Sequence, residues 1–82
     1  MRKILIGTTK IGEEIAQYYL LAEERKDETE IYGVGVIYAG ETVELPRLTT
    51  SQRCIMTLLE ALIRETVTPV ALRDVTEDWL LT

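Results

Sequence analysis

The chain contains no histidine, so it lacks the commonest general base near neutral pH and the commonest metal ligand. Catalysis would therefore have to use carboxylates, lysine, tyrosine or the single cysteine. The densest group of such side chains is Asp74, Glu77 and Asp78, in which Asp74 and Asp78 share a face if the segment is helical. Three carboxylates could bind a divalent cation, but acidic residues are far more often found at helix starts and on solvated faces. We therefore predict no metal site.

Cys54 is the one nucleophile with an activating position, because the start of a helix lowers the pKa of a thiol. No histidine can act as its base, and the neighbouring Ile55 and Met56 indicate packing. We expect Cys54 to be a small buried or half-buried residue without a chemical role.

Gly33-Val34-Gly35 resembles the beginning of a nucleotide-binding glycine motif. Tyr38 stands where the third glycine would be, and no helix follows directly, so a phosphate would lack a helix N-terminus to bind. Two glycines on one strand face instead allow another element to approach closely, or mark a β-bulge. We predict no cofactor and no catalytic residues, and the chain is more consistent with a protein that is not an enzyme.

The aromatic residues are the remaining candidates for a functional surface. Tyrosine and tryptophan are favoured at protein interfaces because they combine a large area with a polar group. The chain has no phenylalanine, so the same residues could simply be its large core side chains. Both interpretations stay open for Tyr18, Tyr19, Tyr32, Tyr38 and Trp79.

A helix over residues 49–66 is the clearest of the elements that would position these groups. Its apolar residues recur at helical spacing and would form one stripe: Ile55, Leu58, Leu59, Leu62 and Ile63. Thr49 is the expected N-cap, with Gln52 completing a capping box and Thr50 or Ser51 as alternatives. Thr68 should end the helix because it precedes a proline. Leu72, Val75 and Trp79 predict a short second helix, capped by Asp74 or by Thr68 with Pro69 at its first position.

The first half of the chain predicts strands at residues 3–6, with a possible extension to 11, and at 30–38 and 42–48. Residues 14–24 fit two patterns. One pattern is a helix with an apolar stripe and with Glu13 and Glu14 in its first turn. The other is a strand covered on both sides. In the strand, Tyr18 and Tyr19 would point to opposite faces. Pro46 lacks an amide donor, which places the last strand at a sheet edge or ends it there.

Composition limits the class of protein. Eighty-two residues make a single domain, residues 1–82, with a net charge of −5 that disfavours nucleic acid and anionic membranes as partners. The apolar run at the N-terminus is too short for a signal peptide or a membrane-spanning helix. One cysteine cannot form an internal disulfide, so a reducing cytoplasm is the expected location.

Several short segments together resemble a small uncharacterised bacterial domain family found mainly in clostridia and related Firmicutes. They are Tyr18-Tyr19-Leu20-Leu21, Tyr32-Gly33-Val34, Val67-Thr68-Pro69-Val70, Leu72-Arg73-Asp74-Val75 and Glu77-Asp78-Trp79-Leu80. The resemblance covers most of the chain and is most specific between residues 67 and 80. It implies a strand-rich first half followed by helix, which favours a strand at 14–24, and it implies no activity or catalytic residue.

The expected fold is α+β: an antiparallel meander of three or four strands, a long amphipathic helix on one face and a short C-terminal helix. The face without helices would then carry apolar side chains, and such patches usually serve association. The expected interface residues are Tyr18, Leu20, Tyr32, Val34 and Trp79.

The leading functional hypothesis is a small cytoplasmic protein-interaction module that self-associates as a homodimer. The first alternative is an acidic regulator that binds a basic protein partner of a nucleic-acid complex. The second is a small ligand-binding domain or enzyme, which requires a concave pocket with convergent polar groups.

Overall fold

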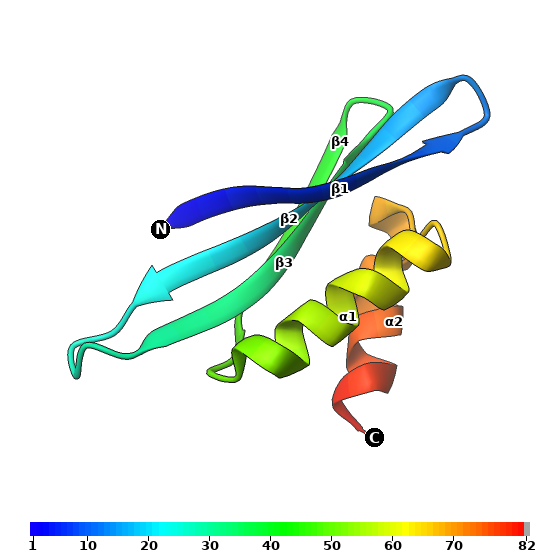
Figure 1. The fold of residues 1–82 in the computed structure, drawn as a ribbon. Coiled ribbons are helices and arrows are strands. Elements are labelled where there is room, and N and C mark those ends of the chain that lie inside the picture. The colour runs from blue at the N-terminus through cyan, green and yellow to red at the C-terminus, as the bar shows by residue number, and fades with distance from the viewer. Residues whose placement is uncertain (82) are drawn as a thin grey trace.

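The computed structural model describes residues 1–81 as a four-stranded antiparallel sheet with two helices (Figure 1). The elements are β1 (Arg2–Ile11), β2 (Glu14–Glu24), β3 (Glu30–Tyr38), β4 (Glu41–Thr49), α1 (Gln52–Arg64) and α2 (Pro69–Leu80). The strands lie in the order β1-β2-β3-β4, so each pairs with its neighbour in sequence. The prediction of an α+β meander is confirmed. The helices, however, are nearly equal in length, at 13 and 12 residues.

Residues 14–24 form an inner strand of the sheet, which decides between the two patterns that the sequence allowed. β2 pairs with β1 along one side and with β3 along the other. Tyr18 is fully buried and the adjacent Tyr19 is half-buried on the opposite face. Large side chains at consecutive positions suit an inner strand, because alternate residues pack on both faces of the sheet.

Both helices pack on one face of the sheet, and the core lies between these two layers (Figure 1). Even-numbered residues of β2 and β3 point toward the helices, and α1 contributes its predicted apolar stripe apart from the half-buried Ile63. The buried cluster consists of Ala16, Tyr18, Leu20, Val34, Val36, Leu45, Ile55, Leu58, Leu59, Leu62, Val67 and Leu72.

The helix ends differ in detail from the predictions. Ser51, one of the alternatives, is the N-cap of α1, and its hydroxyl oxygen accepts a hydrogen bond of 3.1 Å from the Cys54 amide. The Thr49 hydroxyl instead accepts from the Ser51 amide. The helix ends at Arg64, four residues before Thr68, because Thr66 adopts a positive φ of 49°. Thr68 is the N-cap of α2 with Pro69 at the first helical position, so the Asp74 cap is wrong.

Gly33 lies opposite an irregularity in β4. The register moves from Tyr32 opposite Thr49 to Val34 opposite Leu45, so β4 contains extra residues at this point. A Cβ atom on Gly33 would overlap the Leu45 carbonyl oxygen and lie 2.6 Å from the Cα atom of Pro46. The structure therefore confirms a glycine that permits close approach at a bulge. β4 is an edge strand, as Pro46 predicted, but it continues to Thr49.

A buried hydrogen bond connects the sheet to the loop between the helices. The Tyr18 hydroxyl donates to the carbonyl oxygen of Val67 at 2.9 Å, and burial raises the pKa of Tyr18 above its usual value. Tyrosine at this position therefore provides a hydrogen-bond donor to a carbonyl oxygen that is shielded from water and would otherwise be unpaired.

We expect Tyr18→Phe to lower the free energy of unfolding by about 1–2 kcal/mol, because it removes the donor and leaves a buried acceptor unpaired. Urea denaturation followed by circular dichroism would measure the loss. Tyr19→Phe is the matched control, since Tyr19 is half-buried and its 3.4 Å contact with Gln17 is long for a hydrogen bond. Equal stability of the two variants would contradict the prediction.

Candidate functional site

The predicted interface residues lie on the helix-covered side of the sheet. Tyr18 and Val34 are fully buried and Leu20 is 6% exposed, while Tyr32 and Trp79 are partly buried against the same cluster. The expectation that part of this set would lie on an uncovered face is wrong. The reason is that the even-numbered face of β2 and β3 carries the larger apolar set, whereas the odd-numbered face includes the two glycines of β3.

The opposite side of the sheet presents different apolar residues, here called the open face: Leu5, Ile15, Tyr19 and Ile37. Leu5 is directly opposite Tyr19 in the β1–β2 ladder. Leu5 is 49% exposed and Ile15 is 53% exposed, while Tyr19 and Ile37 are half-buried. Alternation along β2 assigns Ile15 and Tyr19 to one face. It does not reveal which face the helices cover.

An ion pair crosses the open side of the sheet. Lys3 on β1 pairs with Glu44 on β4, so the two side chains span both inner strands. Leu21 lies opposite Lys3 in the ladder and is 1% exposed even though no residue of α1 or α2 belongs to its side of the sheet. Gly35 lies on the same side, and a Cβ atom on it would be at an ordinary contact distance of 3.5 Å from Cγ of Glu44. The open side is therefore well packed at Leu21 and exposed nearer the β1–β2 turn.

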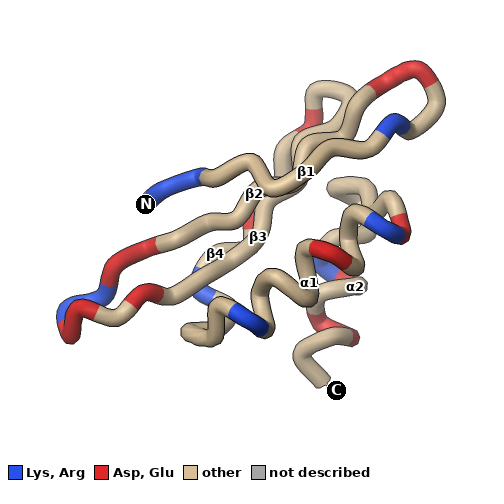
Figure 2. Tube along the Cα trace, in the orientation of Figure 1, with Lys and Arg blue, Asp and Glu red and all other residues tan. Residues whose placement is uncertain are grey.

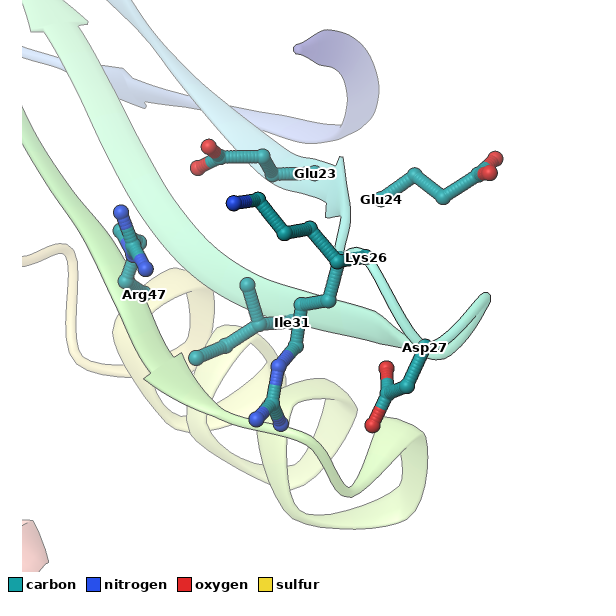
Figure 3. Close-up of a pocket in the computed structure, with 7 residues that line it drawn as sticks. Glu23, Glu24, Lys26, Asp27, Ile31 and Arg47 are labelled. Atoms are coloured by element: carbon teal, nitrogen blue, oxygen red, sulfur yellow. The ribbon is translucent and has the colours of Figure 1, made fainter.

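A hollow of about 550 Å³ lies on the open side where β2 and β3 meet their connecting loop (Figure 3). It is lined by Glu23, Glu24, Arg25, Lys26, Asp27, Ile31 and Arg47. Figure 3 shows Lys26 and Arg47 extending toward the region beside Glu23, above Ile31, whereas Glu24 points away. Within residues 1–81, neither Lys26 nor Arg47 makes an ion pair within 4.0 Å.

The bulge in β4 brings Arg47 to this hollow. Arg47 has a φ of 60°, in the left-handed region that non-glycine residues seldom adopt. It follows Pro46, at the point where the chain passes Gly33. A regular β4 would lack the extra residues and would place Arg47 elsewhere. The irregularity therefore determines where the Arg47 guanidinium lies.

Asp27, on the rim of the hollow, is engaged within its own loop. Its Oδ1 accepts hydrogen bonds from the Thr29 hydroxyl at 2.6 Å and from the Thr29 amide at 3.2 Å. These bonds, with a smaller contribution from Arg25, lower the pKa of Asp27. The hollow meets the condition of convergent polar groups, but charged side chains dominate its lining, whereas small-molecule sites are mostly apolar.

The other candidate chemical groups are exposed. Cys54 lies on the surface of the first turn of α1, so the expected burial of this thiol is wrong. Asp74, Glu77 and Asp78 are exposed on α2. The part of the chain that the structure describes contains no group of three or more Cys, Asp or Glu side chains placed to hold a metal ion.

Acidic side chains are distributed over several elements rather than gathered on one surface. Figure 2 shows them at the turn between β1 and β2, at the loop between β2 and β3, and on both helices. Neither α1 nor α2 is long and apolar enough to cross a membrane, within the described residues.

The fold and these surfaces define a small two-layer α+β domain with helices on one face of a meander and a partly apolar open face on the other. The model of a family of unknown function, DUF6514, matches residues 2–82, and the chain belongs to this family. No curated protein and no solved structure matches the chain.

Proposed function

We propose that the protein is a small cytoplasmic interaction module that forms a homodimer through its open face. The observation that carries the proposal is the pair of half-exposed apolar residues, Leu5 and Ile15, on the side of the sheet opposite the helices. Burying such side chains against a second copy removes apolar area from water, which is the main driving force for association.

The dimensions of the domain are compatible with an interface of the usual size. The principal extents are 43 × 26 × 17 Å, so the broad side has an area of about 1,100 Å², the product of the two longer extents. A typical specific interface buries about 800 Å² on each partner. A contact over most of this side would therefore reach the usual size.

The polarity of this side also suits a second copy. Tyr19 and Ile37 adjoin Gln17 and Thr42, and Lys3 is already neutralised by Glu44. Interfaces that form reversibly mix apolar and polar groups in this way. A self-complementary patch is used twice in a two-fold dimer, so each favourable contact counts twice.

We expect the double substitution Leu5→Ser and Ile15→Ser to weaken dimerisation by about 1,000-fold. The estimate follows from losing roughly 1 kcal/mol for each half-buried side chain, doubled by symmetry. Sedimentation equilibrium over a wide concentration range would measure the dissociation constant. Circular dichroism would establish that the variant remains folded.

The matched control is Val70→Ser with Leu80→Ser, which removes two exposed apolar side chains from α2. These residues are 80% and 50% exposed, so the control makes a similar chemical change away from the open face. A wild-type chain that stays monomeric at high concentration would overturn the proposal, as would a control that weakens the dimer equally.

A further inference from the structure

We infer that the hollow beside the β2–β3 loop binds the phosphate group of a small organic molecule, with the Lys26 ammonium and the Arg47 guanidinium as its main contacts. The inference does not depend on the proposed dimer. Both cations line one hollow, and neither has a partner in the part of the chain that the structure describes. Figure 3 shows them extending toward the same region, above Ile31.

An unfavourable backbone conformation brings the Arg47 guanidinium to the hollow. Of the described non-glycine residues with a positive φ, Arg47 alone lies within a strand, at a φ of 60°. Such conformations are energetically costly, and they are concentrated at ligand-binding and catalytic positions. The strain at Arg47 creates no ion pair among residues 1–81, so a bound anion would supply the partner that the chain does not.

The loop that carries Lys26 is closed by its own hydrogen bonds. The Arg25 amide donates to the Thr29 carbonyl oxygen at 2.7 Å, and the Glu28 amide donates to the Arg25 carbonyl oxygen at 3.1 Å. Asp27 accepts from the amide and the hydroxyl of Thr29 within the same loop. The backbone below Lys26 is therefore ordered before a ligand arrives, which reduces the entropic cost of binding.

The carboxylates around the hollow do not balance its cations. Glu24 points away in Figure 3, and Asp27 already accepts two hydrogen bonds within its loop. Glu23 is the carboxylate beside the two main contacts, and it opposes the binding of an anion. Arg25 adds a third cation to the lining. Because electrostatic attraction scales with charge, a dianion gains more from these three cations than a monoanion does.

The chemistry of the donors and the size of the hollow favour an organic phosphate. A guanidinium offers paired N–H donors that match two phosphate oxygens, and an ammonium adds a compact charge with three donors. The volume of about 550 Å³ is in the range of small-molecule sites and exceeds what a bare phosphate occupies. The half-buried Ile31 provides an apolar surface for the rest of the molecule.

Isothermal titration calorimetry with phenyl phosphate and with inorganic phosphate tests the inference. Sodium chloride holds the ionic strength constant, and a pH above about 7 keeps both probes mostly dianionic. We expect phenyl phosphate to bind at least about threefold more tightly than inorganic phosphate, because its ring removes apolar area of Ile31 from water.

Two variants should change the affinity in opposite directions. Lys26→Gln with Arg47→Gln should weaken the binding of phenyl phosphate at least about tenfold, because it removes two charged donors. Glu23→Gln should strengthen binding about twofold or more, because it removes the repelling carboxylate. Circular dichroism establishes that each variant is folded, and Lys26→Gln alone serves if substitution at Arg47 disturbs the bulge.

Matched controls make the same changes in charge on the helices. Arg53→Gln with Arg73→Gln corresponds to the first variant and Glu60→Gln to the second; all three positions are exposed. Failure of the wild type to bind phenyl phosphate would overturn the inference, as would variants at the hollow that match their controls. Equal affinities for the two probes would overturn the assignment of an organic ligand.

Discussion

Replacing Gly33 with alanine is expected to lower the free energy of unfolding by about 3 kcal/mol. The new Cβ would overlap the Leu45 carbonyl oxygen and approach the Cα atom of Pro46 to 2.6 Å. Both neighbours are backbone atoms of an adjacent strand, so relief requires moving β4 rather than rotating a side chain. Overpacking of this kind typically costs 1–3 kcal/mol, and more where backbone must shift. Urea denaturation of the purified variant would measure the change.

Gly35→Ala is the control within the same strand. Its Cβ would lie 3.5 Å from Cγ of Glu44 and 3.7 Å from the Val43 carbonyl oxygen, which are ordinary contact distances. We expect a change of less than about 1 kcal/mol, because alanine is also less costly than glycine in a strand. Similar losses at Gly33 and Gly35 would show that the β4 irregularity is not what requires glycine at position 33.

Replacing Leu58 with alanine is expected to lower the free energy of unfolding by about 2–5 kcal/mol. Leu58 is fully buried between α1 and the sheet, so the substitution removes apolar contacts and leaves a cavity. For a domain of this size, each kilocalorie corresponds to a fall of about 4–8 °C in Tm. Differential scanning calorimetry would therefore detect a large shift.

Leu80→Ala provides the comparison for Leu58, since Leu80 is a helical leucine that is 50% exposed. Its substitution should cost no more than about 1 kcal/mol because little buried area is lost. If the two variants unfold at the same temperature, Leu58 does not pack in the core as described.

Hydrophobic periodicity carried most of the information about the fold. The stripe of α1 and the β-branched run of β3 predicted both elements, and Gly33 was recognised as a residue that permits close approach. Periodicity could not distinguish strand from helix at residues 14–24, because adjacent large residues satisfy both patterns. The decision comes from pairing with β1 on one side and β3 on the other, which are contacts remote in sequence.

The open face was predicted in kind but assigned to the wrong residues. Sequence alternation separates Tyr18 from Tyr19, yet it does not specify which of them the helices cover. That choice depends on the total apolar area of each face and on where the chain turns after Thr49. The hollow was not predicted, because Lys26 and Arg47 are distant in sequence and Arg47 reaches the hollow through the irregularity at Pro46. A proline and a basic residue in an edge strand are a weak local signal for such a bulge.

The hydrogen bond from Tyr18 to Val67 has a consequence for synthesis of the protein, because its partners are 49 positions apart. A chain made from its N-terminus completes all four strands before either helix exists, and synthesis proceeds at only about 5–20 residues per second. During that interval Tyr18, Val34 and Leu45 have no cover, and the nascent sheet is apolar on both sides. The last third of the chain thus supplies the only cover for the helix-side apolar face of the sheet among the described residues.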